Sequence, residues 1–134
     1  MAAPEIHWAP IIAAAAGYWI LGELWYSKPV LRRIWSRWVP DLACHVRRDV
    51  RAQLVSVVYA GVMSWLTAVV IAAAGVEKLP VGVLIGVAVL AGTKLFSSLT
   101  YARTEAVGHA VWWIHLACQL TGFAGMGCLL TAWR

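Results

Sequence analysis

The sequence predicts an all-α integral membrane protein. We expect a four-helix bundle forming a single transmembrane domain over residues 1–134, with a short amphipathic interfacial helix between helices 1 and 2. Hydrophobic residues make up 62% of the chain and charged residues 13%, whereas soluble domains are about 45–50% apolar and about 25% charged. The apolar residues also form long blocks, and a helix needs about 20 such residues to cross a hydrocarbon core. This composition is not that of a soluble globular domain.

Four apolar stretches have the length of a membrane span. They cover about residues 6–26, 52–74, 81–102 and 112–133. Continuous apolar runs such as residues 11–21 lack the alternation of membrane β-strands, so helices are expected. Residues 1–5 lack the basic stretch that precedes the apolar part of a signal peptide, and we expect the first span to be retained.

The basic residues predict the orientation of these spans. Eight lie in the first and third connections: Lys28, Arg32, Arg33, Arg37, Arg47, Arg48, Arg51 and Arg103. The opposite side carries only Lys78 and Arg134. Because cytoplasmic loops are enriched in Lys and Arg, we expect both termini outside, in the periplasm of a Gram-negative source. The net charge of +5 then reflects orientation and does not indicate nucleic-acid binding.

The segment of about residues 29–51 is predicted to lie on the membrane surface. Its apolar residues share one helical face, namely Val30, Leu31, Ile34, Trp35 and Trp38. The Arg residues beside this face are expected to bind anionic lipid headgroups. A solvated charged linker is the alternative.

Aromatic side chains are predicted to anchor the spans at the two interfaces. Trp8 and Trp133 mark the outer interface. The inner one is marked by Trp25, Tyr26, Tyr101, Trp112 and Trp113, together with Trp35 and Trp38 of the interfacial segment.

Four polar residues occupy the inner half of the predicted spans and form a candidate intramembrane cluster. They are Glu23, Lys94, His115 and Gln119. A cation at the centre of a membrane helix costs about 2.5–3.5 kcal/mol, so Lys94 requires a partner or a route to water. The alternatives are an interaction with Glu23, snorkelling of Lys94 alone, and a proton or ion pathway through both residues.

No catalytic or metal-binding motif is evident. His109 and His115 are six residues apart, which does not align them on one helix face. The three cysteines, Cys44, Cys118 and Cys128, lack the spacing of a zinc or redox site. We predict no metal and no cofactor, while contact with a peripheral pigment, haem or quinone stays open.

Small residues at four-residue spacing predict helix-contact faces. Span three contains Gly82 and Gly86, and span one contains Ala13 and Gly17. Span two carries the stripe Ala60, Ser64, Ala68 and Ala72.

The first span closes on Gly-Glu-Leu-Trp-Tyr-Ser at residues 22–27. This motif resembles the end of the first helix in the DUF1761 family of small bacterial membrane proteins, and the later helical hairpin is similar as well. The resemblance implies a four-helix membrane domain. We expect the chain to lie in the bacterial inner membrane, with several membrane spans. The family is one of unknown function and supplies no catalytic residues.

These features favour a small non-catalytic protein over an enzyme. We expect an accessory or assembly subunit that packs against a larger membrane complex, for example a respiratory or photosynthetic one. The alternative is a homo-oligomeric transporter or channel that uses the polar cluster. An enzyme acting on lipid headgroups has the least support. The expected partners are lipids and either other integral membrane proteins or further copies of the chain.

Overall fold

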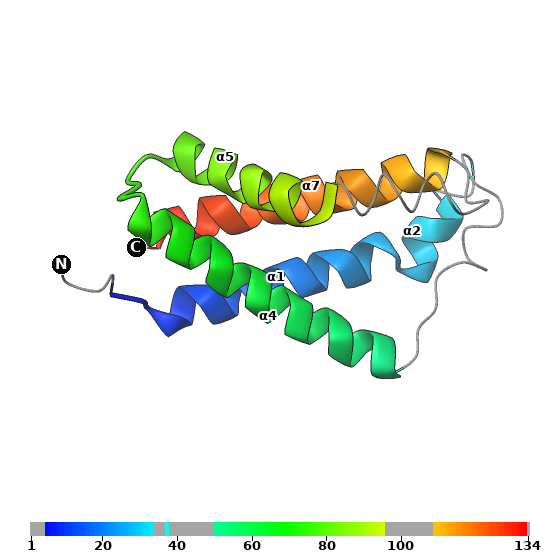
Figure 1. The fold of residues 1–134 in the computed structure, drawn as a ribbon. Helices are drawn as coiled ribbons and strands as arrows, with labels where there is room; N and C mark the ends of the chain where they lie inside the picture. The colour runs from blue at the N-terminus through cyan, green and yellow to red at the C-terminus, as the bar shows by residue number, and fades with distance from the viewer. Residues whose placement is uncertain (1–4, 34–36, 38–49, 96–108, 134) are drawn as a thin grey trace.

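The computed structural model describes residues 5–33, 37, 50–95 and 109–133, and within these ranges it is helical and contains no β-strand. The elements are α1 (Trp8–Trp25), α2 (Lys28–Arg33), α4 (Val50–Ala73), α5 (Leu79–Leu90), the π-helical turn η2 (Ala91–Leu95) and α7 (His109–Ala132). Figure 1 shows α1, α4, α5 with η2, and α7 as the four main helices. The predicted all-α class is confirmed.

The helices follow the predicted apolar blocks closely. α1, α4 and α7 lie within three residues of the expected bounds at both ends. The third block is helical from Leu79 to Leu95, and its predicted remainder, residues 96–102, lies outside the described ranges. Helix α2 covers the start of the predicted interfacial segment, whereas Trp35 and Trp38 are not among the described residues.

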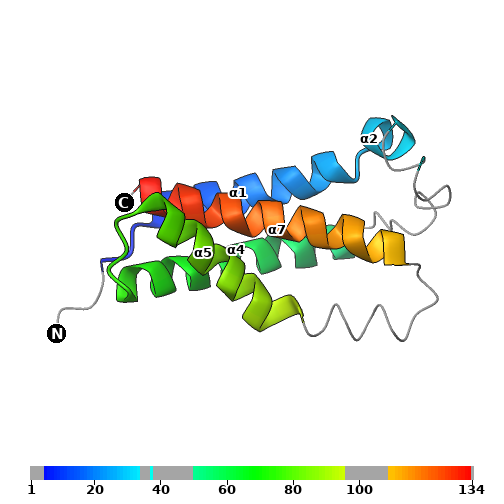
Figure 2. The ribbon, with the colours of Figure 1, turned by 90° about the horizontal axis from the view of Figure 1, so that it is seen from above.

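The four main helices run along one another, with α5 packed chiefly on α7 and α1 packed on both α4 and α7. Figures 1 and 2 show α2 at one end of the bundle. The α4–α5 turn, the start of α1 and the end of α7 lie at the opposite end.

Glycine and proline set the turn between α4 and α5. Gly75 has a φ of 61°, the left-handed conformation in which helices commonly end. The backbone N–H of Val76 then donates to the carbonyl of Ile71 at 3.2 Å. Pro80 lies in the first turn of α5, where its missing N–H has no helical partner to lose.

The α5–α7 contact is built on glycine. Gly82, Gly86 and Gly127 are all buried. A Cβ atom added to Gly82 would collide with the side chain of Thr131 and lie 2.9 Å from the carbonyl oxygen of Gly127. The helices therefore approach to backbone contact, as the spacing of Gly82 and Gly86 predicts.

The contact faces of α1 and α4 are only partly as expected. Ala60 and Ser64 of α4 are buried, and the Ser64 hydroxyl donates to the carbonyl of Ile11 in α1 at 2.8 Å. Gly17 is exposed, and no atom lies within 4 Å of a Cβ atom added there, so Gly17 makes no helix contact within the described part of the bundle. The buried face of α1 instead runs through Ile11 and Ala14.

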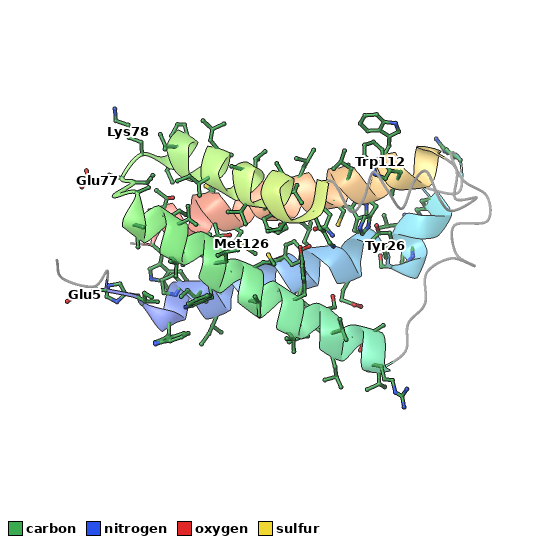
Figure 3. All side chains as sticks on the ribbon, in the orientation of Figure 1. Glu5, Tyr26, Glu77, Lys78, Trp112 and Met126 are labelled. Atoms are coloured by element: carbon green, nitrogen blue, oxygen red, sulfur yellow. The ribbon has the colours of Figure 1, made fainter. Side chains whose placement is uncertain are left out.

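The main core lies near the α4–α5 turn. Its buried residues come from three helices and the turn itself: Ile11, Ala14, Ile71, Val76, Met126 and Leu130. Figure 3 shows Met126 within the bundle. Phe123, with 0% of its surface exposed, lies one turn of α7 farther from that end.

Many large apolar side chains point away from this core. On α4 they include Val50, Leu54, Val55 and Val58, each more than 60% exposed. Helix α4 and the Trp112–Ala132 part of α7 are long and apolar enough to cross a membrane, and the apolar helix of residues 79–94 is shorter.

Candidate binding pocket

A partly open pocket of about 420 Å³ lies among α1, α4, η2 and α7. Its lining combines aromatic, charged and hydrogen-bonding side chains with a few apolar ones. The polar and aromatic members are Tyr18, Trp19, Glu23, Tyr26, Gln53, Ser56, Tyr59, Lys94, His115, Cys118 and Gln119. Small-molecule sites usually have apolar walls with a few convergent polar groups, whereas polar and aromatic side chains predominate in this lining.

All four residues of the candidate polar cluster line this one pocket. Glu23 comes from α1, Lys94 from η2, and His115 and Gln119 from α7. Helices α1 and α7 run in opposite directions. Glu23 near the end of α1 and His115 near the start of α7 therefore reach the same end of the bundle.

Lys94 lies over an aromatic ring. Its Nζ atom is 4.5 Å from the centroid of the Tyr59 ring on α4. This distance allows a cation–π interaction, which partly replaces the hydration of the ammonium group. Lys94 belongs to the π-helical turn η2, and π turns inside α-helices occur frequently at functional sites.

Tyr18 forms the inner wall of the pocket. Its hydroxyl donates to Oε1 of Gln119, and its ring meets Phe123 edge-on with centroids 5.5 Å apart. The Tyr18 ring can lie here because residue 122 is glycine. A Cβ atom added to Gly122 would lie 2.6 Å from Cδ2 of Tyr18. The Tyr18 ring therefore both lines the pocket and packs against Phe123.

Tyr26 and His115 form a second polar pair. The Tyr26 hydroxyl oxygen and His115 Nδ1 are 2.8 Å apart. In the neutral imidazole that carries its proton on Nε2, the hydroxyl donates to Nδ1. Both residues are half-buried. Tyr26, predicted as an interfacial anchor, is thus also a lining residue of the pocket.

Sequence reasoning did not single out Tyr18 or Trp19. Both lie in the middle of an apolar helix, where a tyrosine hydroxyl or an indole N–H requires a hydrogen-bond partner when it is buried. This need for a hydrogen-bond partner is the sequence feature that could have pointed to both residues. It does not identify the partner, because Tyr18 and Gln119 are 101 residues apart in the chain.

The predicted aromatic anchors fall into two groups. Trp8, Trp113 and Trp133 are exposed, whereas Trp25 and Trp112 are half-buried. The rings of Trp112 and Trp113 meet edge-on with centroids 4.7 Å apart. Figure 3 shows Trp112 and Tyr26 toward the same end of the bundle.

Metal-binding side chains do not gather within residues 5–33, 50–95 and 109–133, where no group of three His, Cys, Asp or Glu could hold an ion. Cys118 is buried and Cys128 half-buried, and both are free thiols. The pocket therefore offers one amine, one carboxylate, one imidazole and several hydroxyl, amide and aromatic groups. This set is suited to binding through hydrogen bonds, charge and aromatic contact.

No curated protein and no solved structure shows significant similarity to this chain. The family model described as "Protein of unknown function (DUF1761)" matches residues 9–131. The match includes the Gly-Glu-Leu-Trp-Tyr-Ser motif, all but the first residue of α1 and the last of α7 among the four main helices, and every lining residue of the pocket. The chain belongs to the DUF1761 family.

Proposed function

We propose that this chain is a four-span protein of the bacterial inner membrane with both termini in the periplasm. Support comes from the two long apolar helices and from the exposed apolar surface of α4. The charge distribution agrees, because the Arg-rich α2 and the α4–α5 turn with Lys78 lie at opposite ends of the bundle. With the α2 end in the cytoplasm, the pocket lies in the cytoplasmic half of the bilayer.

Within that membrane domain, we propose a non-catalytic role in binding a small molecule in the pocket. The observation that carries this proposal is the convergence of Glu23, Lys94, His115 and Gln119 on a single pocket. Ionisable residues inside a membrane bundle raise the free energy of the folded protein, and they commonly mark a ligand or ion site. A volume of about 420 Å³ is within the usual range of small-molecule pockets.

A transporter is one form that this role can take. Tyr18 and the fully buried Phe123 stand between the pocket and the core near the α4–α5 turn. A ligand that crosses the chain would have to displace this packing. In the conformation described, the pocket is a binding cavity, and transport by a homo-oligomer would require a second conformation.

The proposal is tested by native mass spectrometry of the protein released from its own membranes. The wild-type chain should carry a small molecule in addition to loosely bound lipid. Ser56→Phe, which introduces a ring into the pocket lining, should remove it. The matched control is Val62→Phe, an enlargement of an exposed position on the same helix. A wild-type chain without a bound molecule, or equal retention by both variants, would reject the role.

An accessory subunit is the second candidate, favoured by the exposed apolar side chains at the start of α4. A larger membrane complex would cover this surface with another integral membrane protein in place of lipid. Purification in mild detergent should then recover a stoichiometric partner. Replacing Leu54 and Val58 with Ala should weaken that association, whereas replacing the exposed Leu84 of α5 should leave it intact.

A further inference from the structure

Ser56 of α4 differs from the other serine and threonine residues that the structure describes. Each of the others donates its hydroxyl to a backbone carbonyl, namely Ser27, Ser64, Thr67, Thr93, Thr121 and Thr131. Serine and threonine commonly form such bonds in helices. Within the described part of the chain, the Ser56 hydroxyl has no hydrogen-bond partner. Ser56 is exposed and lines the pocket, so a molecule in the pocket can reach this hydroxyl.

Gln119 of α7 brings an amide group to the same pocket. Only 7% of its surface is exposed, and it is a lining residue. Its Oε1 accepts the hydrogen bond from Tyr18, and the amide nitrogen donates to no group in the described ranges. The Trp19 indole nitrogen and the Tyr59 hydroxyl are shielded completely, whereas the Gln119 nitrogen is not. The Gln119 amide is therefore a largely buried donor that is available to a ligand.

The two charged residues of the described lining do not require an ionic ligand. Lys94 lies over the Tyr59 ring, and both Lys94 and Glu23 already interact with other groups of the chain. Their formal charges are opposite and cancel. An ion would add a net charge to this balanced lining inside a membrane, where charge is costly, so a neutral ligand is favoured.

The remaining lining favours a ligand with an apolar body. Tyr18 and Tyr26 contribute aromatic rings, on which other rings pack well. Val55 also lines the pocket and is 69% exposed. It belongs to the exposed apolar surface of α4 that includes Leu54 and Val58. Under the proposed topology this surface faces lipid, so a molecule dissolved in the bilayer can reach the pocket.

We propose that the pocket binds a neutral, lipid-soluble carbonyl compound that enters from the bilayer. The proposal rests on the ligand-binding function proposed above and names its ligand class. The carbonyl oxygens of the ligand accept hydrogen bonds from the Gln119 amide and the Ser56 hydroxyl, because a carbonyl only accepts and both groups can donate. The apolar body of the ligand packs on the aromatic rings and on Val55.

The test is calorimetric titration of the full chain in nanodiscs of a diether phosphatidylcholine, which lacks ester carbonyls. Empty nanodiscs correct for partitioning into the lipid. The probes all carry an alkyl chain on a benzene ring: octanophenone, octylbenzene, para-heptylbenzoate and para-heptylbenzylammonium. Octanophenone should bind about fivefold more tightly than octylbenzene, because only the ketone accepts a hydrogen bond, and more tightly than both ions. Equal binding of ketone and hydrocarbon, or tighter binding of either ion, overturns the proposal.

A second arm of the titration uses ordinary diester phosphatidylcholine and identifies the source of the carbonyl. If octanophenone binds equally well there, the native ligand is a molecule separate from the bulk lipid. If its binding is weaker while that of octylbenzene is unchanged, the esters of neighbouring lipids compete for the site and supply the carbonyl.

Variants assign the binding to the two donors. Gln119→Leu combined with Ser56→Ala should abolish the preference for octanophenone over octylbenzene. Ser56→Ala alone changes an exposed side chain and should reduce this preference even if the double variant does not fold. Tyr18→Phe removes the same internal hydrogen bond but leaves both donors, so the preference should persist. Thr121→Val is the control on α7, outside the pocket. An undiminished preference in the double variant, or an equal loss in Thr121→Val, overturns the assignment.

These outcomes separate the ligand class from the broader proposal. If octylbenzene binds as tightly as octanophenone and Ser56→Phe abolishes the binding of both, the pocket is a binding site and the carbonyl class is wrong. If the molecule released from the native chain is an ion, the class is again wrong and the binding function stands. The absence of any bound molecule from the native chain rejects both.

Discussion

Gly86 of α5 lies against the backbone of Phe123 in α7, so closely that a Cβ atom added to Gly86 would stand 3.0 Å from the Phe123 carbonyl carbon. The collision partner is backbone, which cannot rotate away as a flexible side chain could. Gly86→Ala should therefore push α5 away from α7 and destabilise the protein by about 1–3 kcal/mol, the usual range for overpacking. Denaturation with SDS in mixed micelles measures this change.

Gly61→Ala on α4 is the matched control, because no atom lies within 4 Å of the added Cβ there. In a helix interior this substitution should be neutral or stabilising by up to about 1 kcal/mol. If the two variants lose the same stability, the backbone contact between α5 and α7 does not have the importance assigned to it.

Ser64→Ala tests the hydrogen bond between α4 and α1. Ser64 is fully buried, and its hydroxyl donates to the Ile11 carbonyl at 2.8 Å. Hydrogen bonds between membrane helices contribute about 0.6 kcal/mol on average and at most about 1.7 kcal/mol, so a loss in this range is expected in the same unfolding assay. Thr121→Ala removes an exposed hydrogen bond within α7 and should change stability by less than about 0.5 kcal/mol.

The Tyr26–His115 pair is tested by a double-mutant cycle with Tyr26→Phe and His115→Phe. If the 2.8 Å contact stabilises the fold, the two changes should be coupled by about 0.5–1.5 kcal/mol, because either substitution alone removes the same hydrogen bond. The cycle of Tyr26→Phe with Thr93→Val provides the control, since the Thr93 hydroxyl donates within its own helix. Strict additivity for Tyr26 and His115 would contradict a direct energetic link.

The proposed topology is tested by labelling single cysteines. With Cys44, Cys118 and Cys128 replaced by serine, new cysteines are placed at the exposed positions 33 and 77 as Arg33→Cys and Glu77→Cys. In intact cells, an impermeant maleimide should label position 77 and should reach position 33 only after the inner membrane is opened. Labelling of both positions from the same side would contradict a four-span topology.

The helices were predictable because each depends on local composition. Apolar blocks predict α1, α4, α5 and α7, and the left-handed Gly75 with Pro80 delimits the turn between two of them. The contact of Gly82 and Gly86 with α7 also follows from local spacing, since only glycine permits approach to backbone distance. Gly17 has the same local chemistry but is exposed, so small size permits a close contact without causing one.

The position of each residue along its span grouped four residues as the candidate polar cluster, but it did not give the contacts that these residues make. Counting residues from the helix ends places Glu23, Lys94, His115 and Gln119 in one half of the bundle. It does not give the rotation of each helix about its axis. That rotation brings Lys94 to Tyr59 and Tyr18 to Gln119, and it depends on packing between residues far apart in the chain.

The π turn η2 (Ala91–Leu95) continues helix α5 and alters the spacing of its side chains. Gly82, Gly86, Leu90 and Lys94 recur every four residues, a spacing that in a regular α-helix keeps side chains on one ridge. The first three are buried, and both glycines contact α7. A π turn widens the helical repeat, so the ridge changes direction before it reaches Lys94. Residues 82–90 thereby hold α5 against α7, while Lys94, beyond the start of the π turn, lies over the Tyr59 ring of α4.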